Sequence, residues 1–133
     1  MILVDASVWI DFFTGSDTAE TKHLADLLED GAAPLGLADL SLFEVLRGFR
    51  HPQDFLAARQ ALAILPVVEI GGEHNALAAA EHYRALRARG ITVNSPVDVL
   101  LASYCIEHEH ALLHSYRDFD ALESLHGLKV WRH

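Results

Sequence analysis

Four acidic residues in distant parts of the sequence carry the clearest indication of chemistry: Asp5, Glu44, Asp98 and Asp118. Asp5 ends a short apolar run at the N-terminus, and Asp118 follows a second apolar run at residues 111–114. Carboxylates a few ångströms apart raise one another's pKa and destabilise a site unless a cation lies between them. If the four side chains meet, we therefore expect them to hold a divalent metal ion.

The chemistry of these donors narrows the choice of metal. Carboxylate oxygens are hard ligands, and the single cysteine, Cys105, excludes a cysteine-rich zinc site, so Mg²⁺ or Mn²⁺ fits best. Such an ion acidifies a water, contacts a phosphate oxygen and offsets charge in a pentavalent transition state. The expected reaction is hydrolysis of a phosphodiester bond. A bound cation would also offset the formal net charge of −9, which otherwise repels nucleic acids.

Each acidic residue also has a structural interpretation. Asp5 can cap the turn after its strand, although a carboxylate at the end of a buried strand is costly without a partner. Glu44 has capping-box spacing from Ser41. Asp98 and Asp118 stand where each can stabilise the start of a helix. The joint placement of the four residues is what favours a metal site.

The four acids can meet only if strands and helices bring them together. Short apolar runs predict five strands, at residues 1–5, 34–38, 66–70, 111–114 and 128–131. Apolar periodicity and capping patterns predict helices near residues 7–13, 17–30, 41–48, 53–65, 73–89, 96–109 and 118–125. This alternation predicts an α/β fold, a three-layer α/β/α sandwich with a mostly parallel, about five-stranded sheet. Ligands bind such sheets at the carboxyl ends of the strands, where Asp5 and residues 115–118 would lie.

Length and composition set the class of protein. The 133 residues, 51% of them hydrophobic, predict a single domain over residues 1–133. The apolar stretch at residues 61–68 is only about eight residues long, against the roughly 20 that a membrane span needs. With one cysteine and no signal-peptide pattern at the N-terminus, we expect a soluble, cytoplasmic protein that does not bind membranes.

Four sequence blocks, in order, resemble those of PIN-domain ribonucleases. They read V-D-A-S-V-W-I-D (residues 4–11), L-F-E-V-L-R-G (42–48), S-P-V-D-V-L-L-A (95–102) and A-L-L-H-S-Y-R-D-F-D (111–120). The short chain is similar to the VapC-like toxins of VapBC type II toxin-antitoxin pairs. The resemblance implies a PIN-like fold and a Mg²⁺-dependent endoribonuclease, with Mn²⁺ as the alternative ion. It also implies an RNA substrate, inhibition by a cognate antitoxin, and a homodimer.

Carried over by position, the resemblance assigns the catalytic, metal-binding acids to Asp5, Glu44, Asp98 and Asp118, and a supporting hydroxyl to Ser7.

The last block departs from the commonest family pattern, in which a Thr and a further Asp precede the Asp-Phe pair. Those two positions hold His114 and Tyr116 in this chain, so the role of fourth acid falls to Asp118. A weaker second-metal site or a shifted preference for Mn²⁺ is the hypothesis that this departure suggests.

Other residues in these blocks have two interpretations each. Arg47, three residues after Glu44, can contact a phosphate or an antitoxin carboxylate as a supporting residue, or can be an ordinary solvated arginine. For Trp9, Phe12 and Phe13 we expect packing in the core or in a groove for an antitoxin helix rather than base stacking.

The alternative function is a non-catalytic PIN-fold module that binds a partner protein. The acidic residues favour the nuclease, because a scaffold has no reason to gather uncompensated carboxylates. A phosphatase is disfavoured because Lys22 and Lys129 both lie outside the acidic blocks.

Overall fold

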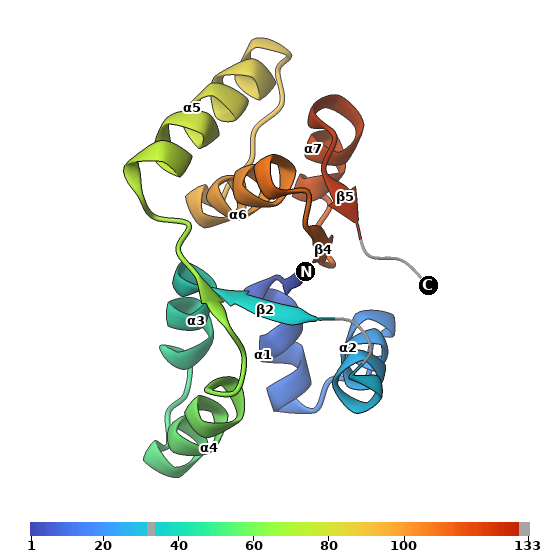
Figure 1. Cartoon of the computed structure of the whole chain (residues 1–133), viewed down its shortest axis with the longest axis vertical. Coiled ribbons are helices and arrows are strands. Elements are labelled where there is room, and N and C mark those ends of the chain that lie inside the picture. Colours follow the sequence, from blue (N-terminus) through green and yellow to red (C-terminus); the bar gives the residue numbers. More distant parts are fainter. Residues whose placement is uncertain (32–33, 131–133) are drawn as a thin grey trace.

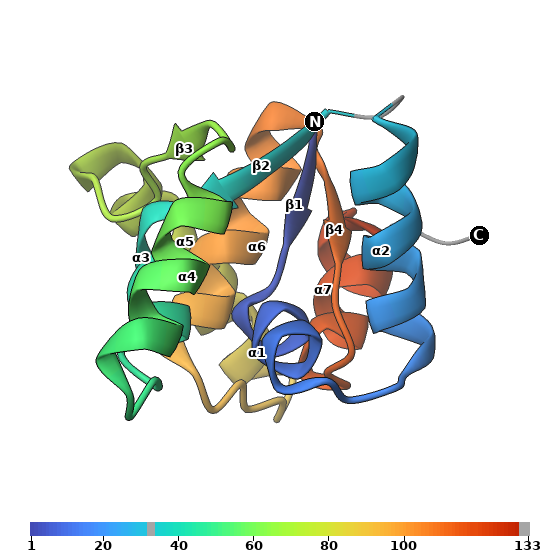
Figure 2. The same cartoon turned by 90° about the horizontal axis from the view of Figure 1, so that it is seen from below.

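A parallel sheet forms the centre of the molecule. The computed structural model describes residues 1–31 and 34–130, except for the side chains of residues 118, 124 and 125. Five parallel strands follow the order β3-β2-β1-β4-β5 (Figure 1 and Figure 2). They are β1 (Ile2–Val4), β2 (Leu35–Ala38), β3 (Val67–Val68), β4 (Ala111–Leu113) and β5 (Lys129–Val130). The central strand β1 is buried along its length, as a parallel sheet covered on both faces requires.

Helices cover both faces of the sheet. They are α1 (Ala6–Thr14), α2 (Ala19–Asp30), α3 (Asp39–Leu46), α4 (Pro52–Leu62), α5 (Glu73–Ala88), α6 (Pro96–His108) and α7 (Asp118–His126). Figure 1 shows α5, α6 and α7 on one side of the sheet and α1 to α4 on the other. The predicted three-layer α/β/α sandwich is therefore confirmed. In the described ranges, no helix is both long enough and apolar enough to cross a membrane.

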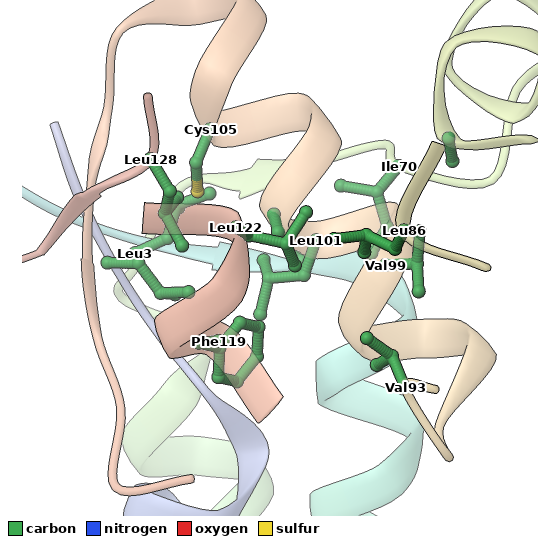
Figure 3. Packing of buried hydrophobic residues seen from close by; sticks show 14 residues of the cluster. Leu3, Ile70, Leu86, Val93, Val99, Leu101, Cys105, Phe119, Leu122 and Leu128 are labelled. Atoms are coloured by element: carbon green, nitrogen blue, oxygen red, sulfur yellow. The ribbon is translucent and has the colours of Figure 1, made fainter. Parts of the chain in front are cut away.

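Successive side chains of β1 point to opposite faces of the sheet and pack into two different hydrophobic cores. Leu3 points into the core beneath α5, α6 and α7, whereas Ile2 and Val4 point into the core beneath α1 and α2. Figure 3 shows the first of these cores, with Leu3 near Phe119 and Leu122 of α7. Because each strand residue packs on one face or the other, a shift of register by one residue would exchange the two cores.

Two details of the predicted elements are wrong. Helix α3 begins at Asp39 and not at Ser41, which is buried within the helix, so the predicted capping box does not form. The Asp39 carboxylate instead accepts hydrogen bonds from the amides of Leu40 and Ile70, each at 2.9 Å, which accounts for the earlier start.

The second wrong detail is strand length at the sheet edges. Strand β3 has two residues rather than the five predicted, and it pairs with β2 alone. Strand β5 is also shorter than predicted, and position 131 of that prediction lies outside the described residues.

The aromatic side chains after β1 pack internally. Trp9 is buried, its ring stacks on Phe13 at 6.0 Å between centroids, and it meets Phe12 edge-on at 6.1 Å. This confirms the interpretation of Trp9 as a core residue. Cys105 is buried too, and burial raises the pKa of its thiol to about 12, so it acts as a small hydrophobic side chain.

A pair of histidines joins α5 to α7 and predicts a pH dependence of stability. The rings of His82 and His126 lie 4.6 Å apart with their Nδ1 atoms facing. Burial lowers the pKa of His82, and His126 lowers it further, whereas Glu81 raises it. A lowered pKa means that the unfolded chain binds the proton more readily, so stability is lost as the pH falls through the ordinary histidine range.

We therefore expect the melting temperature to fall between about pH 7.5 and about pH 5.5. The fall should be smaller in His82→Gln, since the group that resists protonation is gone. Differential scanning fluorimetry measures it, with His51→Gln, an exposed histidine at the start of α4, as the control. Equal falls in wild type and His82→Gln would contradict this account.

Candidate active site

The carboxyl ends of β1 and β4 lie side by side. The Asp5 amide, just after β1, donates a hydrogen bond to the Leu113 carbonyl at the end of β4, at 2.9 Å. Beside them is a cavity of about 260 Å³. Its lining comes from α1, α3, the start of α6 and the segment after β4. The lining residues are Asp5, Ala6, Ser7, Ile10, Glu44, Arg47, Ser95, Asp98 and Tyr116.

Asp5 connects β1 to α1 at the wall of this cavity. Only 2% of its surface is exposed, and its carboxylate accepts hydrogen bonds from the Ser7 amide at 3.3 Å and from the Ser7 hydroxyl. Burial raises the pKa of the Asp5 carboxyl, while the hydrogen bonds from Ser7 and the charge of His114 lower it. Asp5 does cap α1, as its structural interpretation predicts, but it also presents a costly buried charge to the cavity.

Glu44 and Arg47 face the same cavity from α3. The sequence predicted Glu44 in the first turn of this helix. It lies in the second turn, because the helix begins at Asp39. Its spacing of three from Arg47 still places both side chains on one helix face. Burial raises the pKa of Glu44, the charge of Asp5 raises it further, and Arg47 lowers it. The pKa of Glu44 therefore depends on both the carboxylate of Asp5 and the adjacent guanidinium of Arg47.

Asp98 reaches the cavity from the first turn of α6, as predicted. It is buried, and its amide donates to the Ser95 carbonyl at 3.1 Å. Three of the four predicted acids, Asp5, Glu44 and Asp98, thus line one cavity although they lie far apart in sequence. Asp118 begins α7, and its side chain lies outside the described residues.

Ser7 and Tyr116 complete the wall. Ser7 lies between Asp5 and the segment after β4, with its Oγ 3.5 Å from the Ser115 Oγ. Burial raises the pKa of Tyr116, and the carboxylates of Asp5, Asp98 and Asp11 raise it further, whereas Ser7 lowers it.

Two of the residues that contribute to this cavity, Tyr116 by its position and Asp11 by its charge, were not predicted from the sequence. Tyr116 stood out only as a departure from a pattern, and its place in the cavity depends on the path of the chain after β4. Asp11 is four residues from Ser7, a spacing that places both on one face of α1 and that could have indicated it.

The arrangement is looser than the predicted metal cluster. Among the described side chains, no three His, Cys, Asp or Glu residues are grouped so that they could together hold a metal ion. The donors nevertheless suit Mg²⁺, which keeps several waters in protein sites and takes one or two carboxylates directly. The charge of Asp5 raises the pKa of Glu44, a repulsion that a cation between them would relieve.

Comparison with known proteins is consistent with this geometry. Residues 2–125 match the family model of the PIN domain. The VapC ribonuclease Mb1587 of Mycobacterium bovis and ribonuclease VapC11 of Mycobacterium tuberculosis are each 29% identical to this chain over 130 residues. The match covers 98% of this chain and 97% of each relative.

Solved structures share the fold at low identity. VapBC2 from Rickettsia felis, bound to promoter DNA, matches with a TM-score of 0.76 at 14% identity, covering 99% of this chain and all of that one. DNA-bound VapBC from Salmonella typhimurium gives 0.74 at 15% identity, with 98% and 96% covered. A toxin-antitoxin complex from Klebsiella pneumoniae gives 0.68 at 18% identity, with 90% of each chain covered. Sequence and fold agree, and the chain belongs to the PIN-domain family.

Proposed function

We propose that this protein is a Mg²⁺-dependent endoribonuclease, able to use Mn²⁺, that acts as the toxin of a toxin-antitoxin pair. One observation carries the proposal: Asp5, Glu44 and Asp98, from three distant segments, line one cavity at the carboxyl end of the sheet. The relatives named VapC ribonucleases support the choice of RNA. Single-stranded loops are the expected targets, since they expose a flexible backbone.

The residues of the cavity would have different roles in phosphodiester hydrolysis. Asp5, Glu44 and Asp98 would hold the ion, with Asp118 as the fourth ligand expected from the sequence. When bound, a divalent ion supplies an acidified water and offsets negative charge on the phosphate. The Ser7 hydroxyl donates to Asp5 and thereby orients its carboxylate.

One further side chain contributes to the proposed reaction. The exposed Arg47 can donate hydrogen bonds to a phosphate oxygen at the rim.

We further propose that a cognate antitoxin inhibits the protein and that two copies form a homodimer. The support for the antitoxin is that the structural neighbours are VapBC and toxin-antitoxin complexes. An antitoxin carboxylate could pair with the same Arg47 that would meet a phosphate, which would block the cavity and neutralise the one cation among its described lining residues.

The first test is cleavage of mixed RNA by purified protein free of antitoxin. We expect endonucleolytic fragments with Mg²⁺ or Mn²⁺ and intact RNA with EDTA. Intact RNA under both metals would contradict the proposal and would favour a non-catalytic PIN-fold module that binds a partner protein.

A further inference from the structure

Packing in the hydrophobic core does not explain the position of the aromatic side chain of Tyr116. Half of its surface is exposed, at 50%, and yet it lines the cavity that also holds Asp5 and Asp98. Its neighbour in the same segment, Phe119, is fully buried. Hydrophobic packing therefore explains the position of Phe119 and leaves that of Tyr116 unexplained.

Tyr116 lies among the carboxylates of this cavity. Burial raises the pKa of its hydroxyl, and the charges of Asp5, Asp98 and Asp11 raise it further, so the ring stands beside the residues proposed to hold the ion. The exposed half of the side chain is left at the surface, where RNA can reach it.

A half-exposed aromatic ring that lines the proposed active site has a specific use. Single-stranded RNA is bound largely by stacking of its bases on aromatic side chains. An acidic side chain at position 116 would instead add to the repulsion of the RNA backbone by the cavity.

We infer that Tyr116 forms a nucleobase subsite, on which a base next to the scissile phosphate stacks and so positions the RNA over the carboxylates. This inference rests on the proposed ribonuclease function. It assigns Tyr116 to binding and positioning, with no proton transfer, so its loss should affect KM more than kcat.

The test compares Tyr116→Leu, which removes the ring, with Tyr116→Phe, which keeps it. Tyr83→Leu is the matched control, since Tyr83 is also exposed but lies on α5. Binding of a labelled single-stranded RNA is measured by fluorescence anisotropy in an Asp98→Asn background, which should not cleave it and leaves Ser7 and Asp5 unchanged. The KM and kcat of cleavage are measured in the otherwise wild-type protein.

We expect Tyr116→Leu to weaken binding and raise KM about tenfold, with kcat within about twofold of wild type. Tyr116→Phe should retain most of the binding, and Tyr83→Leu all of it. An RNA with an abasic site beside the cut position should bind wild type and Tyr116→Leu equally well, because the stacking partner is missing.

Three results separate the subsite from the proposed function. Normal binding by Tyr116→Leu, or a tenfold loss that persists with the abasic RNA, would overturn the subsite while leaving the ribonuclease intact. Failure of wild type to bind and cleave RNA would overturn both. Melting curves of the metal-free variants show whether each one is folded. If Tyr116→Leu is not, weaker binding of the abasic RNA than of the intact RNA by wild type supports the subsite, and equal binding overturns it.

Discussion

Asp5→Asn should lower the rate of RNA cleavage by about 10²–10³-fold, the usual effect of removing one preorganised electrostatic group from an active site. Asn keeps the shape of the side chain and can still accept the hydrogen bonds from Ser7, so α1 remains capped. What it loses is the negative charge that the proposed metal site requires. The matched control is Asp26→Asn, an exposed acid on α2, which should cleave RNA like wild type.

The same variant should be at least as stable as wild type without metal. Burial raises the pKa of Asp5, so the folded protein holds this proton more tightly than the unfolded chain does. Stability from this group is therefore greatest at low pH and is lost as the pH rises through the folded pKa, which leaves an unfavourable charge at pH 7. Thermal unfolding in EDTA measures the difference. A large loss of stability in Asp5→Asn would mark Asp5 as structural and contradict its role as a metal ligand.

Mg²⁺ or Mn²⁺ should raise the melting temperature of the wild-type protein. An ion that binds only the folded state stabilises it by about 2.7 kcal/mol at 100 times its Kd. For a chain of this size, that corresponds to a rise of roughly 10 °C. The rise should be much smaller in Asp5→Asn and in Asp98→Asn, because each lacks a carboxylate that lines the cavity.

A titration by scanning fluorimetry tests this expectation, with Asp26→Asn again as control. An equal rise in wild type and in both cavity variants would place the stabilising ion elsewhere on the protein, for example at the exposed His74 and Glu107 pair.

Much of the fold could be predicted because local patterns and tertiary packing agree. The apolar run before Asp5 became the central strand, since its branched side chains suit burial on both faces. The start of α3 could not be predicted from local capping, because it depends on the bond from the Ile70 amide to Asp39, 31 residues away. The edge strand β3 was predicted too long because its apolar run indicates burial, whereas the extent of pairing depends on β2.

The candidate site was predicted in outline and missed in detail. Asp5 and Asp98 were identifiable from a strand end and a helix start, and both line the cavity. Glu44 was assigned to the wrong helical turn, yet its side chain still reaches the cavity because α3 as a whole lies beside it. The place of Tyr116 in the cavity lining depends on the path of the segment after β4, for which its sequence has no local pattern.

The position of a bound ion is the most direct test of the whole account. Crystals grown with Mn²⁺ allow an anomalous difference map that locates the metal without reference to any assumed ligand. We expect a peak within the cavity, in contact with carboxylate oxygens of Asp5 and Asp98 directly or through water. A map with its strongest peak away from this cavity, in protein that cleaves RNA with Mn²⁺, would contradict it.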